Sequence, residues 1–158
     1  MNRSLEKTHV RLLARDLLRL SPSPSDPTSF SLGSASVSRA ETVGTVVSCD
    51  LTPKFLKFAV DDGTGCVTCM LWLNHLTSSY FSRWKPSTVS LVARAARDQA
   101  VKVRIGHVAR VRGRITSYRG ALQITVTVVV MERDPNAEIL HWLECLTLAR
   151  RCYRLVCN

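Results

Sequence analysis

Apolar and polar residues alternate along three successive segments in the first half of the chain. This pattern predicts strands at Val43–Cys49, Lys54–Val60 and Cys66–Leu73, because alternation places one side of a strand in a core and the other in solvent. The last two segments are joined by Asp61-Asp62-Gly63-Thr64-Gly65, whose glycines adopt positive φ at little cost. Three consecutive twisted strands that begin a small barrel are a known platform for single-stranded nucleic acid.

A helical period of apolar residues appears in three other places. We predict helices at His9–Leu20, at Ser87–Val103 with Ser87 as its cap, and after Asp134-Pro135-Asn136 with Asp134 as its cap and Pro135 at its first position. The serine- and proline-rich stretch Ser21–Ser36 predicts an irregular connection.

Two longer alternating segments, His107–Tyr118 and Ala121–Arg133, are joined at Arg119-Gly120, which predicts a tight hairpin. The resulting order is helix, three strands, helix, two strands, helix. It predicts a mainly β fold with flanking helices: the five-stranded Greek-key barrel called the OB-fold, with a helix between strands three and four. A plain α+β sheet with the same order is the alternative. We divide the chain into an N-terminal helix and connection (1–36), the OB-fold (37–133) and a C-terminal helix (134–158).

Charge adds a class of partner to this fold. The formal net charge is +10, and residues 94–119 hold eight arginines and lysines against one aspartate. Such a basic excess most often meets a polyanion, with nucleic acid as the leading choice. A solvated basic face is the alternative. Residues 134–158 hold three acidic side chains against three arginines, so the C-terminal helix fits an interface better than DNA.

The fourth predicted strand carries the sharpest pattern of charge. Alternation places four small or apolar residues on its inner face: Ala109, Val111, Gly113 and Ile115. The outer face then carries Arg110, Arg112, Arg114, Thr116 and Tyr118. Arginines and a tyrosine on one strand face follow a phosphate backbone and stack on a base. An ordinary solvated face, or arginines that pair with acidic residues of a partner, are the alternatives.

Aromatic residues on the second and third strands extend this candidate DNA surface. Phe55 shares an exposed face with Lys57, and Trp72 shares a face with Met70, which suits base stacking next to phosphate contact. Phe55 is equally well explained as a hydrophobic residue at the rim of the barrel, and Trp72 as one that fills the barrel mouth.

Catalytic and metal-binding motifs are not found in the sequence. Cys66-Val67-Thr68-Cys69 has the spacing of half a zinc site, but residues three apart on a strand point to opposite faces and no second pair follows. No nucleophile motif, phosphate loop or acidic metal cluster is present. We therefore expect neither an enzyme nor a cofactor.

Targeting signals are equally sparse. No apolar run approaches the roughly 20 residues that cross a bilayer, and no secretory signal is visible. The arginine-rich segment His9–Leu20 also resembles a mitochondrial transit peptide, but Glu6 and Asp16 count against that reading.

The C-terminal helix has more apolar surface than one contact needs. One stripe is formed by Ile139, Trp142, Leu143, Leu146, Ala149, Tyr153 and Val156. Further positions that add apolar surface fall elsewhere, at Leu140, Thr147, Leu148 and Leu155. A two-faced terminal helix commonly docks against another helix, so we expect a partner there. A helix that only caps its own barrel is the alternative.

Taken together, these residues resemble the middle OB-fold subunit of the CST telomere complex, which is related to the middle subunit of replication protein A. The matching segments span nearly the whole chain in order: Arg11–Leu18, Val43–Val47, Phe58–Trp72, Gly106–Tyr118 and the segment from Asp134 onward. Within them, VDDGTG followed by VxCxxW is the most specific part. Animal and fungal members carry winged-helix domains after the last helix, and this sequence looks like the short plant-type form.

The resemblance implies a non-enzymatic subunit that binds single-stranded, G-rich telomeric DNA in the nucleus. In this family the C-terminal helix pairs with a small OB-fold partner, and a large multi-OB subunit completes the heterotrimer. The complex protects chromosome ends and assists lagging-strand fill-in by DNA polymerase α–primase. A general single-strand binding role like that of replication protein A, or a mainly structural bridging role, are the alternatives.

Overall fold

Five strands close into a barrel in the computed structural model, which describes residues 5, 7–74 and 85–153. The strands are β5 (Arg39–Leu51), β6 (Phe55–Asp61), β7 (Cys66–Trp72), β8 (Val108–Tyr118) and β9 (Ala121–Met131). Their order is β5-β6-β7-β9-β8, and β8 pairs again with β5 to close the sheet. Only the β7–β9 pairing within this ring is parallel. This is the predicted OB-fold, and the open α+β sheet is excluded.

Alternation places the core as the sequence predicts. Ala109, Val111, Gly113 and Ile115 of β8 are buried, and so are Leu56, Phe58 and Val60 of β6. Two glycines allow the strands to approach closely. A Cβ at Gly113 would lie 2.1 Å from the carbonyl oxygen of Thr125, and one at Gly44 would lie 2.6 Å from that of Asp61. A side chain at either position would therefore push neighbouring strands apart.

The N-terminal segment differs from the predicted helix at His9–Leu20. It forms a short strand, β1 (His9–Arg11), which pairs in parallel with β5, and then a helix of five residues, α1 (Ala14–Leu18). The helix begins at Ala14 because the β6–β7 turn caps it. The Asp62 Oδ2 atom accepts a hydrogen bond from the Ala14 N–H at 2.8 Å, and the Thr64 Oγ1 atom accepts one from the Arg15 N–H at 3.1 Å. The β6–β7 turn thus also makes a contact with residues far away in sequence.

The segment Ser21–Ser36 is also more ordered than predicted. It forms a small antiparallel sheet of β2 (Ser21–Pro22), β3 (Phe30–Leu32) and β4 (Ala35–Val37). Phe30, Leu32 and Val37 are buried. These three side chains attach the sheet to the rest of the molecule, which explains how so polar a segment keeps a regular structure.

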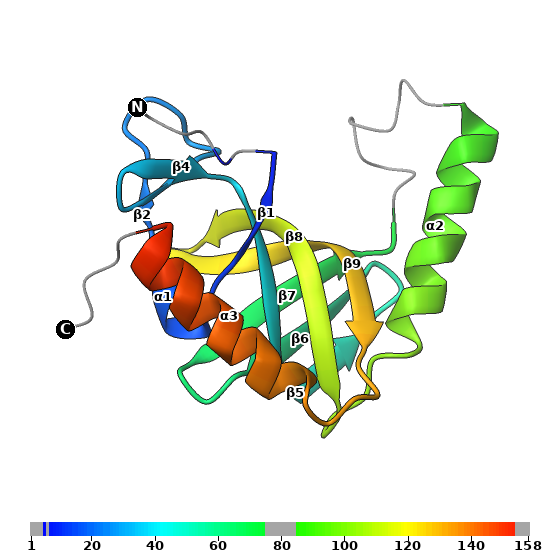
Figure 1. Cartoon of the computed structure of the whole chain (residues 1–158). Coiled ribbons are helices and arrows are strands. Elements are labelled where there is room, and N and C mark those ends of the chain that lie inside the picture. Colours follow the sequence, from blue (N-terminus) through cyan, green and yellow to red (C-terminus); the bar gives the residue numbers. More distant parts are fainter. Residues whose placement is uncertain (1–4, 6, 75–84, 154–158) are drawn as a thin grey trace.

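Two longer helices complete the fold (Figure 1). Helix α2 (Pro86–Ala100) stands beside the barrel and begins with Lys85 at its cap position, so the predicted cap Ser87 does not serve. Helix α3 (Ala137–Arg151) runs across β1 and β5, and its cap position is taken by Asn136, which makes no side-chain capping hydrogen bond, rather than by Asp134. Asp134 instead accepts a hydrogen bond from the Asn136 N–H at 2.9 Å.

The remaining predictions concern membrane spans and the C-terminal end of the chain. Among the described residues no helix is long and apolar enough to cross a membrane. Two residues of the predicted C-terminal stripes, Leu155 and Val156, lie outside the described residues.

Candidate nucleic-acid interface

An aromatic pair lies on the outer face of the barrel. Phe55 begins β6, Trp72 ends β7, and the register places them directly opposite each other. Their ring centroids are 5.7 Å apart and the rings meet edge to face at 71°. Trp72 is 45% exposed and Phe55 is half-buried. The structure therefore brings two predicted site residues into one surface that offers a π-face to solvent.

A row of facing positions continues across the barrel from this pair. Lys57 lies opposite Met70, Met70 lies beside Thr125, and Thr125 lies opposite Arg114. Lys57 and Arg114 are exposed, while Met70 and Thr125 are half-buried. The row thus carries a cation at each end, on β6 and on β8, with small and apolar side chains between them.

The β8–β9 hairpin adds a second aromatic group next to a cation. Tyr118 is exposed at the end of β8, and the Arg119 guanidinium lies 5.2 Å from the centre of its ring. Arg119 and Gly120 both have positive φ, at 50° and 79°, as a tight hairpin with the twist of its strands requires. The predicted site included Tyr118 but not Arg119. Arg119 could have been predicted as a site residue, because it directly follows Tyr118, the last residue of the stripe.

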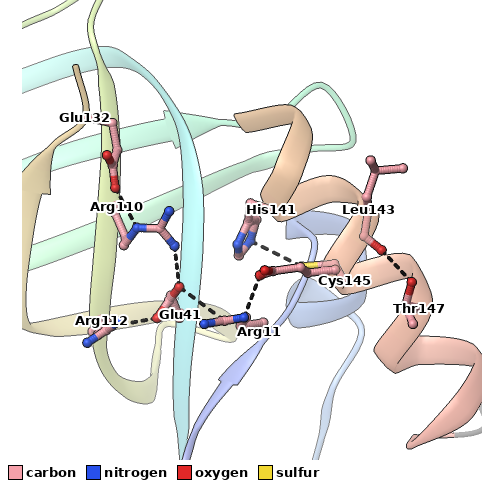
Figure 2. A network of polar contacts seen from close by, with 10 residues as sticks. Arg11, Glu41, Arg110, Arg112, Glu132, His141, Leu143, Cys145 and Thr147 are labelled. Atoms are coloured by element: carbon pink, nitrogen blue, oxygen red, sulfur yellow. Dashed lines mark hydrogen bonds and ion pairs between the residues drawn. The ribbon is translucent and has the colours of Figure 1, made fainter. Parts of the chain in front are cut away.

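Arg110 and Arg112, in contrast, are held by carboxylates of the same chain (Figure 2). Arg110 donates from Nη1 to Glu41 and from Nε to Glu132, and Arg112 donates from Nε to Glu41, each at 2.6 Å. Pairing with acidic groups was an alternative reading of the stripe, although the acids were expected on a partner. The predicted stripe is therefore divided between an end paired with carboxylates and an exposed end at Arg114 and Tyr118.

Glu41 is the centre of this ion-pair network. Its side chain projects from β5 toward β8 and is buried, with 2% of the residue exposed. Burial raises the pKa of the carboxyl, but the hydrogen bonds and charges of Arg112 and Arg110 outweigh it, so the pKa lies below its ordinary value. Glu41 was not among the predicted site residues, because the partners of a lone glutamate at the edge of an apolar run can be named only when the strand register is known.

The network also reaches helix α3 through Arg11. The Nε atom of Arg11 lies 3.5 Å from Glu41, and its Nη1 atom lies 2.5 Å from Glu144 on α3. A second tie comes from Trp142, whose Nε1–H donates to the Asp62 carbonyl oxygen at 2.8 Å. One face of α3 is thus fixed to β1, β5 and the β6–β7 turn.

The predicted partner-binding residues of α3 divide between two environments. Ile139 and Leu143 are exposed, together with Leu140, and form an apolar strip on the outer side of the helix. Trp142 and Leu146 are half-buried, and Tyr153 is buried in the core. The helix therefore caps its own barrel with one face and leaves an apolar strip on another.

A cysteine and a histidine meet beneath α3 (Figure 2). The Cys145 Sγ atom lies 3.2 Å from the His141 Nε2 atom, and both side chains are buried. Burial lowers the pKa of His141 and raises that of Cys145 to about 12. The thiol is therefore protonated and the imidazole neutral at physiological pH, so this contact is packing and not an activated nucleophile.

The cysteines of the CxxC segment behave as strand alternation predicts. Cys66 is exposed and Cys69 is buried, so their sulfur atoms leave β7 on opposite sides. In the part of the chain that the structure describes, no group of three or more His, Cys, Asp or Glu residues has an arrangement that could hold a metal ion.

The closed barrel, the helix between its third and fourth strands and the C-terminal helix define an OB-fold protein. No protein-family model matches the chain. Among curated proteins, the chain is 69% identical over 156 residues to the CST complex subunit STN1 of Arabidopsis thaliana, covering 98% of each. It is 30% identical to the human CST complex subunit STN1 over 91% of this chain, but that match spans only 41% of the human protein. The chain belongs to the family of the CST complex subunit STN1.

Solved structures agree on the fold. A chain of the S. pombe Stn1–Ten1 complex matches with a TM-score of 0.71 and 16% identity, covering 92% of this chain and 94% of that one. A chain of a replication protein A heterotrimer bound to single-stranded DNA matches with a TM-score of 0.69 and 19% identity, covering 91% and 97%. At these identities the likeness concerns the architecture. It covers the N-terminal segment and α3 as well as the barrel.

Proposed function

We propose that this chain is the single-stranded DNA-binding subunit of a CST-like complex at telomeres. The observation that carries the proposal is the outer face of the barrel, where the Phe55–Trp72 pair lies beside the row from Lys57 to Arg114. Aromatic faces accept stacked bases of any sequence, and cations beside them contact the phosphates. We call these residues, with Tyr118 and Arg119, the DNA face.

Within this proposal the arginines of β8 have different roles. Arg114 is exposed and stands in the row with Lys57, so we assign it to phosphate contact. Arg110 and Arg112 first neutralise Glu41 and Glu132, and we place them at the edge of the DNA face. Their contribution to affinity is expected to be smaller than that of Arg114, because paired guanidinium groups attract phosphate less strongly.

The partners follow from α3 and from family membership. We propose that the apolar strip of Ile139, Leu140 and Leu143 receives the small OB-fold subunit, since related chains occur in Stn1–Ten1 complexes. A large multi-OB subunit would complete a heterotrimer that protects chromosome ends in the nucleus. The G-rich strand of the telomere is then the DNA ligand, and DNA polymerase α–primase is the enzyme that the complex assists in fill-in synthesis.

Removal of a stacking group and of a free cation tests DNA binding. We expect Trp72→Ala and Arg114→Ala each to weaken binding of a labelled G-rich strand about fivefold or more, measured by fluorescence anisotropy on the purified chain and on the assembled complex. The Arg114 variant is also expected to lower the slope of log K against log salt by about 1. Arg150→Ala removes an exposed arginine from the end of α3 and serves as the control for charge alone. If wild type and the three variants bind the labelled strand with equal affinity, the DNA face is not the DNA-binding site.

A mainly structural bridging role is the second candidate, and the exposed strip on α3 favours it. Leu143→Asp places a charge in the strip without changing the buried face of the helix. We expect this variant to keep its thermal unfolding transition and to lose co-purification of the partner subunit. Arg151→Ala, at an exposed arginine in the last turn of the same helix, provides a control. A variant that still assembles normally would show that α3 is not the docking helix.

A further inference from the structure

An open hollow lies between helix α2 and the loop that joins β5 to β6. It has a volume of about 390 Å³, within the ~300–1,000 Å³ range of small-molecule sites. Its apolar lining includes Leu51, Pro53, Leu73 and Val101, and Arg97 is its charged member. We call it the α2 hollow. Neither the aromatic pair nor the row across the barrel includes any of these residues.

The side chains around the α2 hollow are unusual for a protein surface. Leu51 is 53% exposed and Val101 is 65% exposed, although both are large and apolar. The small side chain of Ala100 is buried at the same place. Apolar groups held open to solvent around a concave site mark a surface that binds something.

Backbone hydrogen bonds fix the α2 hollow next to the DNA face. The N–H groups of Leu73 and Asn74 both donate to the carbonyl oxygen of Lys54, at 2.9 and 3.2 Å. These bonds hold the β5–β6 loop against the end of β7, where Trp72 and Phe55 pair. Leu73 directly follows Trp72, and successive side chains leave a strand on opposite sides, so Trp72 is exposed on the outer face while buried Leu73 lines the hollow. A single strand stacked on the aromatic pair therefore has to pass around the end of β7 to place a further nucleotide in the hollow.

The charge around the α2 hollow fits the same ligand. Arg94 and Arg97 are exposed one turn apart on α2, and Lys54 is exposed on the opposite loop. None of these three groups forms an ion pair with a residue in 7–74 or 85–153. A cation beside an apolar hollow matches a nucleotide, whose base is flat and poorly hydrated and whose phosphate is an anion.

We propose that the α2 hollow is a nucleotide subsite that extends the DNA face onto helix α2. One unstacked base of the single strand enters the hollow against Leu51 and Val101, and Arg97 contacts its phosphate. This inference rests on the proposed DNA-binding function and names a contact outside the barrel strands. It also gives a role to the basic residues of α2, which the β8 stripe leaves unused.

Two pairs of matched variants test the subsite. Val101→Ser and Arg97→Ala alter the α2 hollow, whereas Leu91→Ser and Arg150→Ala remove an equally exposed leucine from α2 and an exposed arginine from α3. Binding is measured by anisotropy on labelled single strands that lengthen by one nucleotide at either end, with folding checked by circular dichroism. We expect the two hollow variants to bind the shortest strand like wild type. On strands long enough to reach the hollow they should lose about fivefold in affinity, and Arg97→Ala alone should lower the salt slope by about 1.

The outcomes separate the subsite from the function on which it rests. If the hollow variants match their controls at every length while Trp72→Ala still weakens binding, the subsite is wrong and DNA binding stands. If Trp72→Ala and Arg114→Ala also bind like wild type, both proposals fail together. If the hollow variants instead lose a co-purifying subunit and keep their DNA affinity, the hollow belongs to a protein partner and the nucleotide assignment is overturned.

Discussion

At the scale of single residues, one buried carboxylate changes the meaning of the arginine stripe. From sequence, three arginines on alternate positions of β8 look equivalent, yet Glu41 pairs with two of them, whereas Arg114 has no ion pair with any residue that the structure describes. A buried charge persists only where partners neutralise it. The same rule explains why Glu41 sits opposite Arg112 in the register of β5 and β8.

Glu41→Gln tests this network through stability. The change leaves Arg110 and Arg112 without their shared anion, so we expect the free energy of unfolding to fall by about 2 kcal/mol, measured by urea denaturation. Because folding lowers the pKa of Glu41, its stabilising effect is full above its unfolded value and is lost as pH falls through the folded value. The difference in stability between wild type and variant should therefore shrink below about pH 4. Asp98→Asn, at an exposed acid on α2, is the control, and a loss no greater than in that control would contradict the role of Glu41.

At the scale of elements, the barrel strands follow from the sequence, except that β5 begins at Arg39 rather than at the predicted Val43. The structure of the N-terminal segment does not follow from the sequence. Predicted and observed bounds of β6, β7 and β8 agree within one or two residues, because alternation against one core is a local signal. His9–Leu20 carries apolar residues that a helix, or a strand followed by a short helix, buries equally well. Pairing with β5 and the cap from Asp62 decide between them, and both partners lie far along the chain.

The candidate site shows the same division between local and distant signals. Phe55, Lys57 and Trp72 come together because a short turn joins their strands and fixes the register, so alternation sufficed to predict one face. The link from Lys57 to Arg114 passes through the parallel β7–β9 pairing. Only closure of the barrel creates that pairing, which no sequence spacing reveals.

Gly113→Ala tests the close approach of β8 and β9. The added Cβ would lie 2.1 Å from the Thr125 carbonyl oxygen and 2.8 Å from the Ile124 side chain. We expect a loss of about 3 kcal/mol, the upper end for overpacking, in chemical denaturation. At Gly65 an added Cβ would meet its neighbours at 3.4 Å or more, so Gly65→Ala should cost much less. Similar losses of unfolding free energy in the two variants would show that β8 and β9 move apart at Gly113 at a lower cost than the contact distances indicate.

At the scale of the whole molecule, the segments before the barrel are part of its core. The sequence divides residues 1–36 from the OB-fold, but Leu12, Leu17, Phe30 and Leu32 pack into one cluster with barrel residues. The β6–β7 turn joins this segment to α3 as well, because Asp62 contacts both Ala14 and Trp142. We therefore expect the described chain to unfold in one transition.

Two neighbouring leucines of α1 provide a direct comparison. Leu17 is fully buried at 0% exposure, whereas Leu18 is 41% exposed. Leu17→Ala is expected to reduce the free energy of unfolding by about 3 kcal/mol, because it leaves a cavity, and Leu18→Ala by less than about 1 kcal/mol. Denaturation followed by circular dichroism measures both. Equal, small effects would mean that the N-terminal segment folds apart from the barrel.

The two described tryptophans lie in different parts of the molecule, so their fluorescence can report on two different binding events. Trp72 stands in solvent on the DNA face, whereas the Trp142 indole is hydrogen-bonded to the Asp62 carbonyl beneath α3. The sequence holds a third tryptophan, Trp84, so each reporter protein also carries Trp84→Phe. With Trp72→Phe added, the remaining Trp142 should report through its fluorescence whether α3 is docked, and with Trp142→Phe added, Trp72 should respond when a single strand binds the barrel. The hydrogen bond that joins the β6–β7 turn to the last helix thus makes docking of that helix visible without any added label.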